Sequence, residues 1–119
     1  MSAFGGVEFD LDQCEIDFLV SSANKCVEGV PGFGFILCRR EVLQSAQGFA
    51  RTISLDLLAQ WQGLEDNGQF RFTPPTHTLL AFGQALNELK SEGGIAARAQ
   101  RYSKNHKACV AGMRLMGFR

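Results

Sequence analysis

One lysine, Lys25, stands where a folded chain has little packing reason to place a charge. Residues 16–20 form a largely apolar run typical of a buried strand, and residues 21–24 (S-S-A-N) are small or polar. After Lys25 the chain enters a loop, residues 29–34, with three glycines and one proline. Burial disfavours the charged form of an amine and makes it a usable nucleophile. Amines of this kind form Schiff bases with carbonyl groups, including the aldehyde of pyridoxal phosphate.

Two other interpretations of Lys25 stay open from the residues alone. Most lysines are solvated surface charges, and a lysine beside a glycine-rich loop is usually one of these. Ser22 and Lys25 also fit the S-x-x-K pattern of serine β-lactamases and penicillin-binding proteins, and residues 103–105 fit their S-x-N pattern. Their third pattern, K-T-G, is absent. Those enzymes also carry the serine and lysine on a helix, whereas here both residues end a strand-like run.

Short elements are predicted around this lysine. Residues Phe33 to Cys38 predict a second strand, and the tight glycine-rich connection favours antiparallel pairing with the first. Helices are predicted from Arg39 to Gln47 and from Ser54 to Trp61, with Ser54 as N-cap of the latter. Residues 65–68 (E-D-N-G) predict a turn, and residues 10–15 a polar turn or short helix.

Thr73 and Pro74 form the second stretch with chemical potential. Threonine is a good N-cap, and proline is favoured at the first helical position, so a helix is predicted to begin here. The free N–H groups and the positive dipole end of a helix start can hold a phosphate. A capped helix without any ligand is the alternative.

Two longer helices are predicted to complete the chain. Residues 76–91 carry apolar residues on one face, and Gly93 and Gly94 are expected to end this helix. The second helix, residues 95–116, has an apolar stripe that favours packing against a sheet, and a basic stripe that predicts a solvated face. His106, on the apolar face, is expected to be a core or boundary histidine. The apolar stripe is Ile95, Ala99, Tyr102, His106, Cys109, Met113 and Met116, and the basic stripe is Arg98, Arg101, Lys104 and Lys107.

Composition is that of an ordinary globular chain, and it disfavours several classes of function. Its 119 residues are 45% hydrophobic and 20% charged. Twelve basic residues balance twelve acidic ones, so no net charge draws the chain to nucleic acid or a membrane surface. No apolar stretch reaches the roughly 18 residues of a membrane span. The four cysteines show no C-x-x-C or metal-ligand pattern and predict reduced thiols in a cytoplasmic protein.

Residues 21–35 resemble the cofactor-lysine segment of the 2-aminoethylphosphonate–pyruvate transaminases. Those enzymes are fold-type-I pyridoxal-phosphate aminotransferases, of the branch that includes alanine–glyoxylate and serine–pyruvate transaminases. The resemblance covers essentially the whole chain. Besides S-S-A-N-K-C-V-E-G-V-P-G-F-G-F, the segments that carry it are S-A-F-G-G-V, A-R-T-I-S-L-D-L-L-A-Q-W, L-E-D-N-G-Q-F-R-F-T-P-P-T-H-T, L-A-F-G-Q-A-L-N-E-L and E-G-G-I-A-A-R-A-Q-R-Y.

The resemblance implies an α/β fold, pyridoxal 5'-phosphate as cofactor, and 2-aminoethylphosphonate and pyruvate as small-molecule substrates. Lys25 would bond to the cofactor and act as general base and acid. Asn24 would donate to the cofactor phosphate, and Thr73 would do so from the partner subunit of a homodimer. Some relatives add a tyrosine three residues before this threonine, and Phe70 stands there in this chain.

The resemblance further implies that the chain is an internal piece of such an enzyme. Residues 1–93 would be the latter part of the large cofactor-binding domain, and residues 94–119 the start of the small C-terminal domain. The aspartate that pairs with the pyridine nitrogen is expected just before Met1, and Asp10 and Asp12 stand too late to replace it. Three functions stay open: this aminotransferase, a related one with another amino donor, and a truncated, non-catalytic product.

Overall fold

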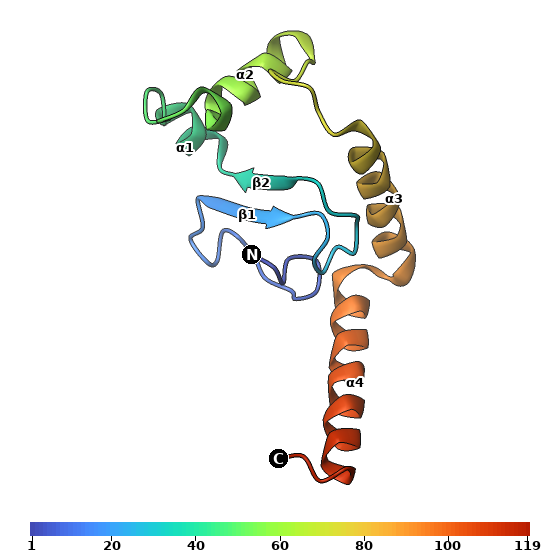
Figure 1. Ribbon diagram of the computed structural model, residues 1–119. Coiled ribbons are helices and arrows are strands. Elements are labelled where there is room, and N and C mark those ends of the chain that lie inside the picture. The colour runs from blue at the N-terminus through green and yellow to red at the C-terminus, as the bar shows by residue number, and fades with distance from the viewer.

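The computed structural model describes residues 1–119, and a two-stranded sheet lies at its centre (Figure 1). Strands β1 (Phe18–Ser22) and β2 (Gly34–Cys38) pair antiparallel, with Val20 opposite Ile36. The connection between them, residues 23–33, carries Lys25 and is closed at its base by the N–H of Ala23, which donates to the carbonyl of Phe33. Both predicted strands and their antiparallel pairing are confirmed.

The N-terminal segment, residues 1–17, runs back along the sheet without forming a strand of its own. The Met1 ammonium group donates to the carbonyl of Val20, and the Ser21 hydroxyl donates to the carbonyl of Met1 at 2.8 Å. Asp10 Oδ1 accepts from two backbone N–H groups, of Asp12 at 2.8 Å and of Gln13 at 3.2 Å. The polar turn predicted over residues 10–15 is therefore confirmed.

Two short helices, α1 (Arg40–Ser45) and α2 (Leu57–Asn67), pack together beyond β2, and a 3₁₀ turn, η1 (Ile53–Leu55), precedes α2. Ser54 lies inside this turn, so its prediction as an N-cap is wrong. Asp56 caps α2 instead, because its carboxylate accepts from the N–H of Ala59 at 3.0 Å. The turn predicted over residues 65–68 also comes too early, since α2 continues through Asn67 and ends at Gly68.

Helix α3 (Thr76–Glu92) begins at Thr76, the first residue of the predicted amphipathic stretch, but later than a cap at Thr73 would place it. Pro75 occupies its N-cap, and Thr73 and Pro74 lie in the preceding loop. The prediction of Thr73 as N-cap is wrong because Pro74 itself precedes a proline, which disfavours the helical conformation at Pro74. Gly93, with φ +106°, ends α3 as predicted, and α4 (Gly94–Leu115) follows at once.

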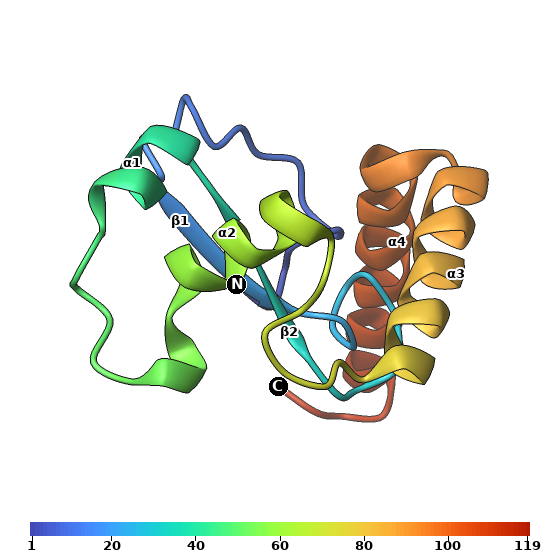
Figure 2. The ribbon, with the colours of Figure 1, turned by 90° about the horizontal axis from the view of Figure 1, so that it is seen from above.

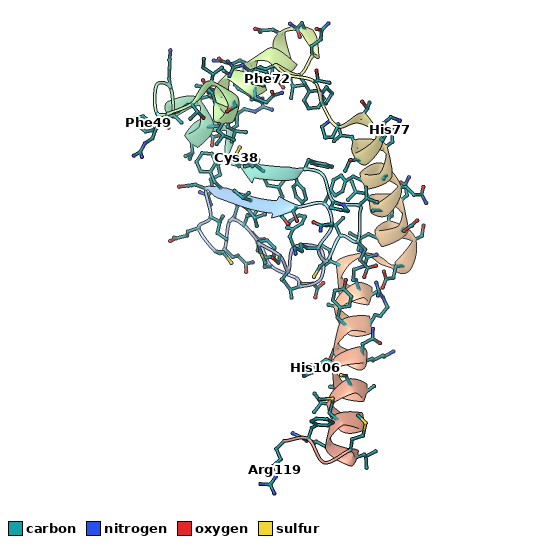
Figure 3. The ribbon with its side chains drawn as sticks, viewed as in Figure 1. Cys38, Phe49, Phe72, His77, His106 and Arg119 are labelled. Carbon is teal, nitrogen blue, oxygen red and sulfur yellow. The ribbon has the colours of Figure 1, made fainter.

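Helix α4 extends away from the rest of the molecule, and only its first turns lie beside other elements (Figure 1). The radius of gyration is 18.1 Å, whereas a compact chain of this length has about 13.5 Å. From His106 onward the apolar stripe of α4 is exposed, so the predicted packing against a sheet is not found within this chain. His106 lies on this free part of the helix (Figure 3), and its prediction as a core or boundary residue is wrong.

The buried core is small, because only 10 of the 119 residues are buried. Leu19, Ala23 and Val27 are buried along β1 and the connection that follows it, while Val20 and Ile36 on the sheet are exposed. None of the helices combines the length with the apolar composition that a membrane-spanning helix requires. The four cysteines are free thiols in the structure.

Candidate functional site

Lys25 lies in a tight turn that directly follows β1. The N–H of Glu28 donates to the carbonyl of Lys25 at 2.8 Å, and the N–H of Gly29 donates to the carbonyl of Ala23 at 2.8 Å. The Lys25 side chain is exposed and forms no hydrogen bond or ion pair within the chain. The expectation that this chain buries Lys25 is therefore wrong: its backbone is packed, but its amine is open to solvent.

Asn24 stands beside Lys25, and its side chain is also exposed. The hydroxyl of Ser22 donates to Asn24 Oδ1 at 2.8 Å, which leaves the amide nitrogen of Asn24 free to donate elsewhere. Because Ser22 ends a strand and Lys25 lies in a turn, these two residues do not share a helix. The β-lactamase-like interpretation of S-x-x-K therefore loses its structural basis.

Thr73 lies apart from Lys25 in this structure. It is exposed in the loop before α3, and its hydroxyl forms no hydrogen bond within the chain. The connection that carries Lys25 instead contacts the first turns of α4 through Arg98, and Figure 2 shows it on the side of the molecule where α3 and α4 lie. The length of α3, about 25 Å at 1.5 Å per residue, separates that junction from the loop of Thr73. Thr73 and Lys25 are thus not brought together within one chain.

A cluster of charged residues packs directly against the Lys25 turn. The Arg98 side chain is only 2% exposed, and its Nη1 donates to the carbonyls of Cys26 and Val27, both at 3.0 Å. Arg98 and Arg101 both pair with Glu92, with Nη2–Oε2 2.8 Å and Nε–Oε1 2.7 Å respectively. The prediction of a fully solvated basic stripe is therefore wrong for Arg98.

Glu28, at the end of the turn, belongs to the same cluster. Arg101 Nη2 contacts both of its carboxylate oxygens, at 2.9 and 3.0 Å, and the Tyr102 hydroxyl donates to it at 2.5 Å. These contacts were not predicted from the sequence. Helix spacing puts residues 98, 101 and 102 on one face, but it does not reveal which distant segment that face meets.

The cluster changes the ionisation of its members. The hydrogen bond from Tyr102 is the largest influence holding the pKa of Glu28 below its ordinary value, and Arg101 and Arg98 add to it. Hydrogen bonds from Arg101 and then Arg98 lower the pKa of Glu92 to about 2. Burial, reinforced by the hydrogen bond to Glu28, raises the pKa of Tyr102 to about 12. The carboxylates of Glu28 and Glu92 are therefore charged at neutral pH.

The sequence of the chain matches one known enzyme family over nearly its full length. Residues 1–118 fit the family described as aminotransferase class-V. The chain belongs to the class-V aminotransferase family. This finding agrees with the mixed arrangement of helices and strands and with the fold class predicted from the sequence.

Curated relatives of this class-V aminotransferase chain carry a more specific name. The 2-aminoethylphosphonate–pyruvate transaminases of Salmonella typhimurium (strain LT2) and Salmonella choleraesuis (strain SC-B67) are each 57% identical to it over 119 residues. A third such transaminase, from Salmonella agona (strain SL483), has the same identity. The alignments cover 99% of this chain and 32% of each relative, so the chain spans about a third of their length.

Class-V aminotransferases generally depend on pyridoxal phosphate, and the exposed groups of this chain fit that cofactor. The Lys25 amine has no hydrogen-bond or ion-pair partner in the chain, so it is free to react with the aldehyde of the cofactor. Asn24 offers free amide donors and Thr73 an unpartnered hydroxyl, both suited to a phosphate. The residues present therefore fit the cofactor in their chemistry.

Proposed function

We propose that this chain forms the lysine-bearing part of a pyridoxal-phosphate aminotransferase that transfers the amine of 2-aminoethylphosphonate to pyruvate. The products of this transfer are phosphonoacetaldehyde and L-alanine, and the process belongs to phosphonate catabolism. The observation that carries the proposal is the unpartnered amine of Lys25 on a hydrogen-bonded turn, in a chain 57% identical to transaminases of that name.

Each of the three candidate residues has a distinct task in this proposal. Lys25 holds the cofactor through its amine and, when free, moves a proton to and from the reacting carbon. Asn24 donates an amide N–H to the cofactor phosphate. Thr73 donates its hydroxyl to the phosphate of the partner subunit's cofactor. Pyridoxal phosphate, when bound, supplies the electron sink that makes the proton at the substrate carbon removable.

A homodimer is part of the proposal, and the separation of Thr73 and Lys25 along α3 supports it, because the Thr73 hydroxyl would then serve the site of the neighbouring subunit. The boundary between the large and small domains is proposed at Gly93–Gly94, where α3 ends and α4 begins.

A cytoplasmic location is proposed as well, because free thiols suit a reducing compartment.

Testing the activity requires a protein of the relatives' length that carries this segment. A graft supplies it: the Salmonella typhimurium transaminase in which this chain replaces the matching 119 residues, here called the grafted enzyme. Its turnover is measured with pyruvate and a panel of amines. We expect 2-aminoethylphosphonate to be the best donor and Lys25→Ala to abolish turnover, because both the covalent site and the proton carrier are lost.

Two alternative functions are judged by the same panel. Preference of the grafted enzyme for another amine, where the unmodified host prefers 2-aminoethylphosphonate, would indicate a related aminotransferase of different donor specificity. A folded graft that binds no cofactor, beside an unmodified host that does, would favour a non-catalytic product and contradict the proposal.

A further inference from the structure

Arg98 has the largest side chain among the fully buried residues of this chain. An arginine is costly to bury unless its donors are satisfied. Here Nε and Nη2 reach Glu92 Oε2 at 2.9 and 2.8 Å, and Nη1 reaches two carbonyls at 3.0 Å. Those carbonyls belong to Cys26 and Val27, the two residues that follow Lys25. The planar guanidinium therefore joins the start of α4 to the backbone beside the lysine.

Glu28 fixes the far end of the same turn in an unusual conformation. Its φ is +64°, in the left-handed region that non-glycine residues rarely adopt. Such a conformation persists only where the surroundings hold it in place. Arg101, Tyr102 and Arg98 all contact the Glu28 carboxylate, Arg98 at 3.6 Å. The backbone N–H of Glu28 in turn donates to the carbonyl of Lys25.

The N-terminal segment closes the turn from another side. A Cβ added at Gly6 would lie 2.9 Å from the Cβ of Cys26 and 2.9 Å from the ring of Tyr102. Gly6 therefore approaches the turn as closely as a backbone without a side chain allows. Cys26 and Val27 thus lie between α4 and the N-terminal segment, while the Lys25 amine is exposed and forms no hydrogen bond or ion pair.

We propose that Arg98 is a positioning residue that fixes the Lys25 turn, so that the direction of the Lys25 amine is set through the backbone by α4. The arrangement of Arg98, Glu28, Glu92, Arg101 and Tyr102 is here called the α4 clamp. The catalytic meaning of the clamp rests on the proposed function, whereas its effect on the turn does not. The clamp also connects the Lys25 turn to the start of the proposed small domain, because Arg98, Arg101 and Tyr102 lie on α4.

The first test measures amide hydrogen exchange in the 119-residue chain. Arg98→Lys keeps the positive charge but loses the fork that reaches two carbonyls and a carboxylate at once. We expect the N–H groups of Glu28 and Gly29 to exchange about tenfold faster or more in this variant, because the turn opens locally. The matched control is Arg114→Lys, at an exposed position near the end of α4, which should exchange as the unchanged chain does.

If Arg98→Lys does not fold, a milder variant provides the same test. Tyr102→Phe removes only the hydroxyl that donates to Glu28. We expect a smaller acceleration at the same two N–H groups. Unchanged exchange at Glu28 and Gly29 in a folded variant would overturn the clamp itself.

The second test separates positioning from mere stability and uses the grafted enzyme. We expect Arg98→Lys to lower kcat roughly tenfold to a hundredfold, because a displaced catalytic group loses its alignment. KM and cofactor content should stay within about twofold, since neither substrate binding nor the cofactor's phosphate contacts involve Arg98. Arg114→Lys should leave all three quantities unchanged.

Two outcomes would contradict the positioning role. In the first, exchange at the turn accelerates while kcat stays unchanged. In the second, the melting temperature and cofactor content fall together while kcat per folded molecule is retained. A grafted enzyme that neither turns over nor holds cofactor before any substitution would instead overturn the proposed function, and the exchange measurement would still decide the clamp.

Discussion

Thr73 presents a hydroxyl group on an exposed loop, with no partner in its own chain. If it serves the phosphate of the partner subunit's cofactor, Thr73→Val in the grafted enzyme should weaken cofactor binding by about 1–2 kcal/mol, the value of one hydrogen bond to a charged acceptor. Cofactor dissociation, measured by absorbance during dialysis, reports this change. Thr52→Val is the control at another exposed threonine. Equal cofactor affinity in Thr73→Val and the unchanged enzyme would remove Thr73 from the site.

Glu92 gives the α4 clamp a defined dependence on pH. Its pKa is lowered from an ordinary 4.5 to about 2, so its contribution to stability is fully present above pH 4.5 and is lost as the pH falls through about 2. The difference in free energy of unfolding between the chain and Glu92→Gln should therefore shrink over that interval. Urea unfolding at several pH values checks this, with Glu65→Gln as an exposed control. A difference that stays constant down to pH 2 would contradict the ion pairing.

Single residues differ in how well the sequence predicts them. Lys25 is recognisable because residue types on both sides of it carry the family resemblance, and that resemblance also covers Asn24 and Thr73. The sequence left a buried and a solvated Lys25 both open, because burial depends on which segments cover the turn, and the structure shows the solvated one. The sequence predicts a solvated side chain for Arg98, because two of its partners are backbone carbonyls. Every residue has a carbonyl, so no sequence pattern indicates which of them an arginine will meet.

At the scale of elements, the connection between β1 and β2 depends on a close backbone approach at Gly29. A Cβ there would lie 2.8 Å from the carbonyl oxygen of Ala23, so Gly29→Ala should destabilise the fold by about 1–3 kcal/mol. Gly83 is the matched control, because it lies within α3 and a Cβ there meets nothing within 4 Å. Gly83→Ala should stabilise the chain by about 0.5–1 kcal/mol. Thermal unfolding of both variants shows whether each substitution lowers or raises the stability. If Gly29→Ala leaves the stability unchanged, the close approach of Gly29 to the Ala23 carbonyl is contradicted.

The start of α2 allows the two candidate caps to be compared directly. Asp56→Ala should cost about 1 kcal/mol, because the N–H of Ala59 loses its acceptor. Ser54→Ala should be nearly neutral, since no hydrogen bond joins the Ser54 side chain to α2. Urea unfolding of the two variants is the measurement. A larger effect at Ser54 than at Asp56 would show that the cap assigned from the sequence is the correct one.

Elements were predictable to the extent that they depend on local patterns. The two strands, α3, α4 and the glycine that ends α3 follow from periodicity and from Gly93. The N-caps of α2 and α3 were misplaced, because serine, threonine and aspartate are all good caps and the choice among them depends on φ/ψ angles that a neighbouring proline or 3₁₀ turn sets. Contacts between α4 and the Lys25 turn span more than seventy residues, and local pattern does not reach that far.

At the scale of the whole molecule, much apolar surface is left uncovered within the chain. Phe18 is 41% exposed, Val20 57% and Ile36 39%, and both strands of the sheet are edge strands. Phe35 on the same sheet is half-buried instead, since its ring centroid lies 5.4 Å from that of Phe4 and 5.3 Å from that of Phe82. Exposed apolar edges favour association between copies.

The 119-residue chain on its own should therefore self-associate. Light scattering coupled to size-exclusion chromatography is expected to give a mass above that of one chain. Replacing Val20 and Ile36 by Thr, which keeps strand propensity but lowers apolar exposure, should reduce association. A soluble monomer would contradict this interpretation of the exposed surfaces.

The most direct test of the central claim is to locate the cofactor's covalent bond. Borohydride reduction of the grafted enzyme with pyridoxal phosphate, followed by peptide mass spectrometry, identifies the modified lysine. The predicted result is a reduced label on Lys25 in stoichiometric amount, and none there in Lys25→Ala. Label on Lys90, Lys104 or Lys107 instead of Lys25, or an unlabelled Lys25 in a cofactor-loaded enzyme, would contradict the assignment.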